Sequence, residues 1–159
     1  MDGVFVGVVF PVTQNVDDLH ERGGSDQVCH MHGELQSMLC TACSQTMPVA
    51  EPYDGNTTCP LCSATGRLRP DIVWFGEMPY FMDEIEARLS SCSLFIAIGT
   101  SGVVYPAAGF VRQASYQGAL CVEVNKETSD VAGYFDHHRT GPATVKVEQL
   151  VNELVTAMP

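Results

Sequence analysis

Four cysteines in this sequence have the spacing of a metal site. They form two pairs with two residues inside each pair and fifteen residues between the pairs: Cys40 with Cys43, and Cys59 with Cys62. Each such turn can aim two sulfur atoms at one ion, so the pattern is typical of a tetrahedral Zn²⁺ site with four thiolate ligands. Two disulfides and a redox-active cysteine pair are the alternatives. The spacing favours one structural zinc ion per chain.

A histidine next to this cysteine-containing segment is a candidate general base. His30 and His32 flank Met31, so on a strand both side chains would point to the same side. His32 directly precedes Gly33, where the cysteine-containing segment begins. An imidazole titrates near neutral pH and can take a proton from a substrate hydroxyl. A purely structural role for His32 is the alternative.

Three polar loops follow predicted strands, at residues 13–20, 99–102 and 125–127. The carboxyl ends of parallel strands meet at one crevice, where ligands bind in open α/β sheets. Gly99, Thr100 and Ser101 offer N–H groups and hydroxyls to phosphate or ribose oxygens, and Asn125 can bond a ribose hydroxyl. Each loop alone also fits ordinary turn chemistry. Together on one sheet edge, they favour a nucleotide-like ligand.

The elements that would position these loops alternate between strands and helices. Apolar strands are predicted at residues 4–10, 94–98 and 119–124, and further short strands at 28–32, 71–77 and 144–147. Helices are predicted at residues 79–91, behind Pro106, and at the C-terminus, where apolar residues recur from Val147 to Met158 with helical spacing. Strands that are apolar throughout and alternate with helices indicate an α/β fold, a parallel sheet covered on both faces.

The end of the predicted strand at residues 71–77 is a candidate peptide-binding site with exposed aromatic side chains. Trp74 and Phe75 precede Gly76 there, and such a strand end can pair with an extended peptide. The alternative is that Trp74 is an ordinary core residue.

Composition excludes some classes of function. Nineteen acidic residues against eight basic ones give a formal net charge of -11, and no run of Lys and Arg occurs, so nucleic acid and anionic membranes are not expected partners. No apolar run approaches the ~20 residues of a membrane span, and residues 1–12 lack the features of a signal peptide. Seven cysteines, an odd number, with zinc spacing predict a reducing compartment, the cytoplasm.

These motifs together resemble the sirtuins, the NAD-dependent protein-lysine deacylases, and most of all their bacterial class III branch. The matching segments follow the family's order and comprise TQNVDDLH at 13–20, HMHGEL at 30–35, the four cysteines, LRPDIVWFGE at 68–77, GTS at 99–101, VYPAA at 104–108, Asn125 and GPA at 141–143. The fold implied is a partial Rossmann-like doubly wound parallel sheet with an inserted small zinc ribbon. The domains implied are an NAD-binding domain, residues 1–33 and 72–159, and a zinc-binding module, residues 34–71.

The resemblance also implies a role for each matching position. His32 would take a proton from a ribose hydroxyl of NAD after the acyl-lysine oxygen has displaced nicotinamide. Contacts to NAD would come from four stretches: Gln14, Asn15, Val16 and Asp17; Gly99, Thr100 and Ser101; Asn125, Lys126 and Glu127; and Ala143. The backbone of an acyl-lysine protein or peptide would lie against Val73, Phe75, Gly76 and Glu77. Zinc would be held by Cys40, Cys43, Cys59 and Cys62.

The sequence also departs from the family pattern. A sirtuin opens with a glycine-rich loop like Gly-Ala-Gly-x-Ser and a Gly-Ile-Pro-Asp-Phe-Arg segment, and this sequence contains neither. We therefore expect the cradle for the NAD pyrophosphate to be missing, and NAD affinity to be lower by several kcal/mol. Residues 1–12 are interpreted as a substitute strand, and an exposed sheet edge predicts self-association. The alternative to an NAD-dependent deacylase is a catalytically inactive sirtuin remnant, a zinc-stabilised fragment that binds peptides or proteins.

Overall fold

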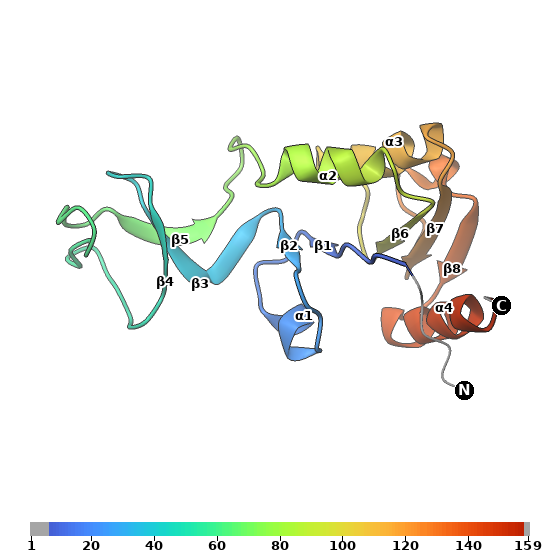
Figure 1. Cartoon of the computed structure of the whole chain (residues 1–159), viewed down its shortest axis with the longest axis horizontal. Coiled ribbons are helices and arrows are strands. Elements are labelled where there is room, and N and C mark those ends of the chain that lie inside the picture. The colour runs from blue at the N-terminus through green and yellow to red at the C-terminus, as the bar shows by residue number, and fades with distance from the viewer. Residues whose placement is uncertain (1–6, 158–159) are drawn as a thin grey trace. The chain divides into compact units, whose positions relative to one another are not determined.

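The computed structural model describes residues 7–157, which divide into two compact units (Figure 1). One unit is Val9–Asp83, and the other contains residues 84–157. Mixed helices and strands, with parallel pairing in two of the sheets, confirm the predicted α/β class.

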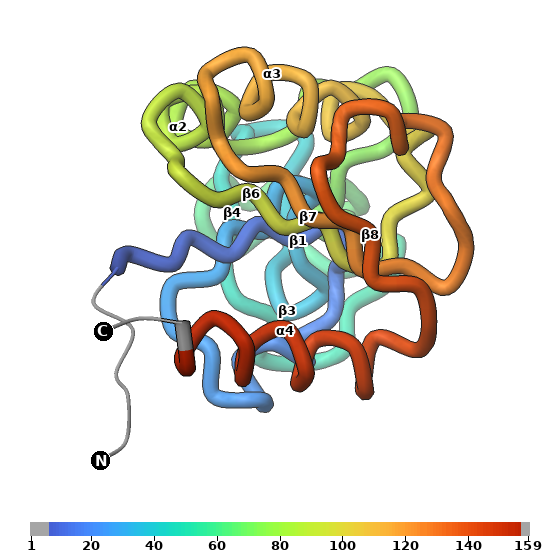
Figure 2. Tube along the Cα trace, turned by 90° about the vertical axis from the view of Figure 1, so that its right-hand side faces the viewer, coloured from blue at the N-terminus to red at the C-terminus, as the bar shows by residue number. Residues whose placement is uncertain are grey.

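The unit at residues 84–157 is built on a parallel sheet in the order β6-β7-β8. Its strands are β6 (Leu94–Ile98), β7 (Leu120–Asn125) and β8 (His137–Thr140). The helices α3 (Phe110–Tyr116) and α4 (Ala143–Ala157) lie on opposite faces of this sheet (Figure 2). A three-stranded parallel sheet covered on both faces is the predicted partial Rossmann-like arrangement.

The side chains of β7 alternate between the two faces of this sheet. Val122 and Val124 form a buried cluster with Leu150 of α4. Cys121 and Glu123 point the other way, and Cys121 is fully buried with its sulfur 4.0 Å from the carbonyl oxygen of Val111 in α3. Because its side chains are buried on both faces, β7 is apolar at most positions rather than at alternate ones.

The helices of this unit follow the predicted patterns. In α2 (Met82–Leu89) the buried residues are Ile85 and Leu89. A 3-10 helix, Ala107–Gly109, leads into α3, the helix predicted behind Pro106, and the buried residues of α3 are Phe110, Val111 and Ala114.

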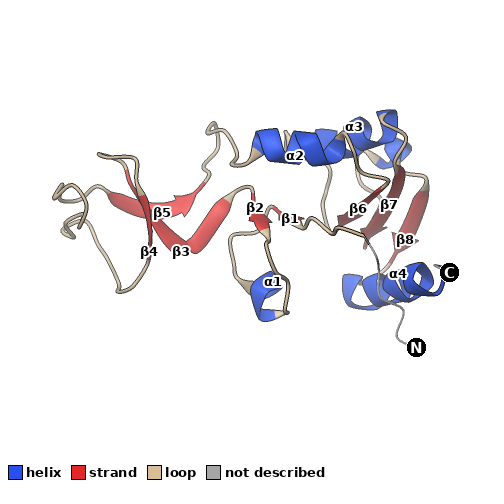
Figure 3. Cartoon of the chain, in the orientation of Figure 1, coloured by secondary structure: helices blue, strands red, loops and turns tan. Residues whose placement is uncertain are grey.

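The unit Val9–Asp83 holds two small sheets and a single-turn helix, α1 (Leu19–Arg22). Strand β1 (Val12–Thr13) pairs in parallel with β2 (Cys29–His30). An antiparallel sheet follows in the order β4-β3-β5, and Figure 3 shows its strands in red. Its strands are β3 (Gly33–Cys40), β4 (Thr46–Pro48) and β5 (Leu68–Ile72).

The start of β3 requires a glycine. Gly33 has φ +75°, and a Cβ there would overlap the carbonyl oxygen of Asp71 on β5. A residue without a side chain is needed here for two reasons. It adopts the left-handed conformation without strain, and it lets β5 approach this closely.

Three predicted strands are corrected by the structure. Residues 144–147 lie in α4, because Val147 packs against the same cluster as Leu150 and so extends the helical face toward the N-terminus. The strand predicted at 71–77 ends at Ile72, and a turn follows. Of the strand predicted at 4–10, residues 7–10 are not in a strand, and Val8 and Val9 are 84% and 72% exposed. Residues 4–6 lie outside the described residues.

Two negative findings hold for residues 7–157. None of the helices there combines the length and the apolar character needed to cross a bilayer. Within the same residues, no two cysteines form a disulfide, so the disulfide alternative for the four cysteines is not what the structure shows.

Candidate functional site

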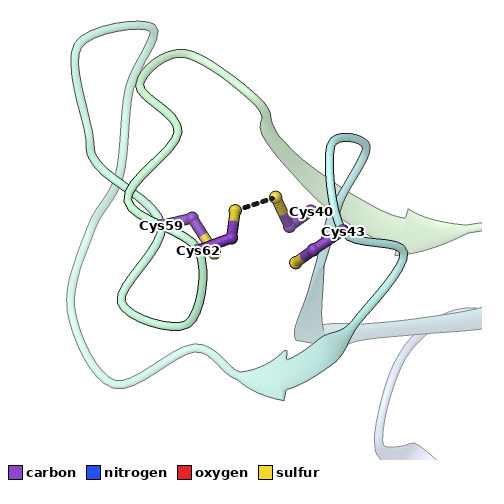
Figure 4. Close-up of side chains that lie close together, drawn as sticks. All are labelled: Cys40, Cys43, Cys59 and Cys62. Atoms are coloured by element: carbon purple, nitrogen blue, oxygen red, sulfur yellow. Dashed lines mark hydrogen bonds between the residues drawn. The ribbon is translucent and has the colours of Figure 1, made fainter.

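The four cysteines of the predicted metal site converge in space. Figure 4 shows their side chains pointing toward one another from two separate loops. The four sulfur atoms all lie within 4.8 Å of one another, and those of Cys40 and Cys62 are 3.7 Å apart. Four sulfurs at about 2.3 Å from one tetrahedral Zn²⁺ ion would be about 3.8 Å apart. The cluster is therefore compatible with one structural zinc ion.

The two cysteine pairs have the same local backbone structure. In each turn the N–H of the first cysteine donates to the carbonyl oxygen five residues later, at 3.0 Å for Cys40 and 2.9 Å for Cys59. The carbonyl oxygen of the same cysteine accepts from the N–H four residues later, at 2.8 Å for Cys40 and 2.9 Å for Cys59. The residue after each pair, Ser44 or Ser63, has a left-handed backbone with φ 57° or 61°. The repeated turn presents two sulfurs from each loop to a common point.

The electrostatics of the cluster also fit a cation. The N–H of Cys43 is the main cause that lowers the pKa of Cys40 to about 6. At Cys62 the N–H of Ala64 lowers the pKa, but burial and the neighbouring cysteines outweigh it and raise the pKa to about 12. Four thiolates so close together repel one another unless a cation balances their charge, and Zn²⁺ supplies that charge.

The cysteine cluster is far from the candidate base. His32 immediately precedes β3, and Cys40 is the last residue of that eight-residue strand. At ~3.3 Å per residue, a strand of this length spans up to about 25 Å. A metal ion held by the cluster would therefore contribute to the stability of the fold rather than to chemistry at His32.

His32 has a defined tautomer. Its Nδ1 lies 3.1 Å from the carbonyl oxygen of Gln14. A carbonyl oxygen only accepts hydrogen bonds, so Nδ1 carries the proton and, in the neutral imidazole, Nε2 is left with a lone pair. The half-buried side chain thus offers Nε2 as a proton acceptor, which is what a general base requires.

The predicted loop beside His32 is fixed to the neighbouring strands. The side chain of Thr13 accepts a hydrogen bond from the N–H of Asn15 at 3.1 Å. The carbonyl oxygen of Val16 accepts from the N–H of Leu35 in β3 at 2.8 Å. Asp17 accepts from the N–H of Leu19 at 3.1 Å and so shapes the entry to α1. The structure thus brings Gln14, the residues up to Asp17 and His32 together in one unit.

The other predicted loops meet in the unit at residues 84–157. The side-chain amide of Asn125 donates to the carbonyl oxygen of Thr100 at 2.6 Å, and its Oδ1 accepts from the N–H of Lys126 at 2.9 Å. The carbonyl oxygen of Ser101 accepts from the N–H of Asp130 at 3.2 Å. The loops after β6 and β7 are therefore joined directly. That the loop at residues 13–20 meets them stays a prediction.

The remaining predicted residues of this group lie next to the same loops. The N–H of Gly141 donates to the carbonyl oxygen of Asn125 at 2.9 Å, and Ala143 begins α4 two residues later. Gly99, Ser101, Lys126, Glu127 and Ala143 are exposed. Backbone and side chains of these loops are thus open to a ligand.

The predicted peptide-contacting segment, residues 73–77, follows β5. The N–H of Val73 donates to the carbonyl oxygen of His32 at 2.9 Å, so this segment starts beside the candidate base. Trp74 and Phe75 are 54% and 105% exposed, and Trp74 is therefore not a core residue.

Sequence reasoning missed a buried carboxylate and its histidine partner. Glu123 on β7 is 2% exposed, and its carboxylate accepts from Nδ1 of His138 at 2.8 Å and from the N–H of Ser129 at 3.2 Å. His138 is exposed on β8 and bonds this buried carboxylate. The missed signal was a carboxylate in the middle of an apolar strand, which needs a partner when it is buried.

Comparison with known families and proteins gives consistent matches. The Sir2 family model matches residues 7–106. Among curated proteins, the NAD-dependent protein deacylase of Shewanella oneidensis is 50% identical over 98% of this chain, and that of Caulobacter vibrioides is 49% identical over 96%. The chain spans 64% of the length of each of these two relatives.

Solved structures resemble the chain over almost the same extent. A Sir2 homologue in complex with ADP-ribose has a TM-score of 0.83 and 33% identity, covering 95% of this chain and 63% of that one. A Sir2 homologue in complex with NAD has a TM-score of 0.79 and 34% identity, covering 94% and 57%. A complex of Sir2 with a p53 peptide and NAD has a TM-score of 0.80 and 27% identity, covering 94% and 65%.

Proposed function

Because this chain belongs to the Sir2 family, we propose that it is an NAD-dependent protein-lysine deacylase. In this reaction NAD supplies the ADP-ribose that receives the acyl group, with nicotinamide as the leaving group. The substrates are acyl-lysine proteins or peptides. Support comes from the relatives described as NAD-dependent protein deacylases and from the family motifs on the described residues.

The observation that carries this proposal is the orientation of His32. Its Nδ1–H is held by the carbonyl oxygen of Gln14, which leaves Nε2 to accept a proton from a ribose hydroxyl. An imidazole whose only proton-accepting atom is Nε2 is suited to this step. The loop from Gln14 to Asp17 would surround the nicotinamide end of NAD.

The other residues of the proposed site bind rather than react. Gly99, Thr100 and Ser101 would donate N–H and hydroxyl groups to phosphate and ribose, with Asn125, Lys126, Glu127 and Ala143 near the adenosine. The hydrogen bond between Asn125 and Thr100 supports a shared role for these loops. Val73, Phe75, Gly76 and Glu77 would lie along the peptide backbone, and the four cysteines would hold one zinc ion.

The organisation and setting of the chain are proposals as well. We assign residues 1–33 and 72–159 to an NAD-binding domain and residues 34–71 to a zinc-binding module. Cysteines without disulfides in the described chain favour a reducing compartment, the cytoplasm. Self-association through a sheet edge is tested by sedimentation of the purified chain over a range of concentrations.

The activity is tested by nicotinamide release from NAD with acetyl-lysine and succinyl-lysine peptides, on the zinc-loaded chain. We expect His32→Ala to lower the rate by at least about a hundredfold, the typical contribution of a general base, while calorimetry shows NAD binding unchanged. His137→Ala is the matched control, because His137 is exposed on β8 and lies outside every proposed ligand-contacting stretch, and it should keep the rate. Unchanged turnover in His32→Ala would remove His32 from this role. Absence of nicotinamide release from the folded wild-type chain would overturn the proposed activity for these residues.

A further inference from the structure

Arg69 on β5 makes three different contacts, one with the last residue of its own strand and two with the segment that follows it. One guanidinium nitrogen donates to the carbonyl oxygen of Ile72 at 2.8 Å, and another donates to Oε1 of Glu77 at 2.8 Å. The guanidinium carbon also lies 4.9 Å from the centre of the Trp74 ring. The Arg69 side chain is only 17% exposed. One partly buried cation thus contacts the end of β5 and both ends of the turn at residues 74–77.

Glu77 completes the arrangement from the other end. Its second oxygen, Oε2, accepts from the N–H of Trp74 at 3.0 Å, while its own N–H donates to the carbonyl oxygen of Trp74 at 2.9 Å. The latter bond closes a four-residue turn in which Gly76 has φ +91°, a conformation that favours glycine. The hydrogen bond from Trp74 and the charge of Arg69 hold the pKa of Glu77 below its ordinary value. The carboxylate is therefore ionised near neutral pH and able to pair with Arg69.

The turn leaves its centre exposed. Phe75 is fully exposed, and the described residues provide no hydrogen-bond partner that the structure records for the N–H groups of Phe75 and Gly76. A peptide approaching this segment would meet an aromatic side chain and available backbone donors held in one fixed shape. Holding such groups in place before binding lowers the ordering cost of association.

We propose that Arg69 is the positioning residue for peptide binding: with Glu77 it fixes residues 73–77 in a preformed turn that receives the acyl-lysine peptide. This inference rests on the proposed function, because it takes the substrate to be an acyl-lysine peptide. It adds a residue outside the set that contacts the substrate. Arg69 acts through Trp74 and Glu77 rather than by touching the peptide.

The geometry requires arginine specifically. A guanidinium donates in two directions at once and stacks on an indole face, whereas the lysine ammonium is a single point charge on a flexible stem. Arg69→Lys keeps the charge but cannot keep all three contacts. We call the three contacts of Arg69, together with Glu77, the clamp. The lysine variant tests the geometry of this clamp separately from its charge.

The chain contains one tryptophan, Trp74, so its fluorescence reports on this segment alone. The first measurement is acrylamide quenching of Trp74 in the wild type, Arg69→Lys, Arg69→Gln and Glu77→Gln. We expect quenching to increase in all three variants, because the indole loses its cover and the turn loosens. Arg22→Gln is the control: it makes the same chemical change in the same unit, at an exposed ion pair 3.8 Å long.

The second measurement is the affinity for tryptophan-free acetyl-lysine and succinyl-lysine peptides without NAD. We expect binding about tenfold weaker in Arg69→Gln, an intermediate loss in Arg69→Lys, and no change in Arg22→Gln. NAD affinity and zinc content should stay at wild-type values, which a general loss of folding would not allow. The double variant, Arg69→Gln with Glu77→Gln, should bind the peptide no more weakly than the single variant of lower affinity. The two losses should not add, because both residues act through one clamp.

The outcomes separate the two proposals. Wild-type peptide affinity in Arg69→Gln, or unchanged quenching of Trp74, would overturn the role of Arg69 and leave the deacylase proposal standing. Failure of the wild-type chain to bind either peptide would overturn the proposed substrate class, and with it the peptide-positioning role, even if the quenching results show that the clamp exists.

Discussion

At the scale of single residues, the unit at residues 84–157 depends on a buried carboxylate. Glu123 bonds a backbone N–H in the loop after β7 and a side chain on β8, so it ties three parts of this unit together. Burial alone would raise the pKa of Glu123, but the hydrogen bonds from Ser129 and His138 outweigh it and lower the pKa below its ordinary 4.5. The charged form is thus the one that the fold stabilises.

Glu123→Gln is expected to reduce the free energy of unfolding by about 1–2 kcal/mol at pH 7, because hydrogen bonds to a buried charge are lost. Since the folded pKa is lowered, the contribution of Glu123 is fully present above its ordinary pKa and is lost as the pH falls through the folded pKa. The difference between the wild type and Glu123→Gln should therefore shrink below pH 4.5. Urea unfolding followed by circular dichroism at several pH values measures it.

Glu127→Gln is the matched control, since Glu127 is exposed on the same loop. It should unfold like the wild type at every pH. A difference between the wild type and Glu123→Gln that stays constant with pH would contradict the assigned role of the charge.

At the scale of elements, β3 connects the candidate base to the cysteine cluster. It begins next to His32, ends at Cys40, and pairs with β4 on one side and β5 on the other. Its first residue, Gly33, sits against the backbone of Asp71. The approach of β5 there also places Val73 beside the carbonyl oxygen of His32. A distortion at Gly33 would displace the candidate base and the proposed peptide-contacting segment together.

Gly33→Ala is expected to destabilise the chain by about 3 kcal/mol or more, because the added Cβ overlaps a backbone carbonyl as well as straining φ. Gly24→Ala separates the two causes. Gly24 has a similar positive φ of +90°, but a Cβ there would have no neighbour within 4 Å, so only the left-handed strain of about 1 kcal/mol applies. Denaturant unfolding followed by Trp74 fluorescence tests both. Equal losses in the two variants would refute the close contact at Gly33.

At the scale of the whole molecule, stability is divided between two compact units with different sources. The unit at residues 84–157 has a sheet with apolar packing on both faces. In Val9–Asp83 the three-stranded antiparallel sheet carries the cysteine cluster at one end. Small modules of this kind draw much of their folding free energy from the metal.

We expect one zinc ion per chain by metal analysis, and selective loss of structure when a strong chelator removes it. Trp74 reports on Val9–Asp83, whereas α3 and α4, which dominate the helical signal, belong to the other unit. Chelation should therefore change Trp74 emission at conditions where ellipticity at the helical band is largely kept. Cys59→Ser should behave like the chelated protein.

Cys92→Ser is the control for this experiment. Cys92 lies in the unit at residues 84–157, outside the cluster, so the variant should keep its zinc and its Trp74 emission. Less than half a zinc ion per chain in freshly prepared wild type would count against the site. Simultaneous loss of both signals on chelation would contradict separate stabilities of the units.

Local sequence patterns determined the cluster of four cysteines, the α/β class, the family resemblance, and elements such as β6 and α3. These depend on spacing and periodicity within a few residues of the chain, which the sequence displays directly. The helical period also extends through Val147, but the β-branched residues before it suggested a strand. Packing of α4 on the sheet overrode that local preference.

Only the tertiary structure decided which distant residues form hydrogen bonds with the functional side chains. The tautomer of His32 follows from Gln14, eighteen residues away. The partner of Glu123 is fifteen residues away. The turn at residues 74–77 follows from Arg69, on the preceding strand. Each depends on which strands pair and in what register, and neither composition nor local periodicity carries that information.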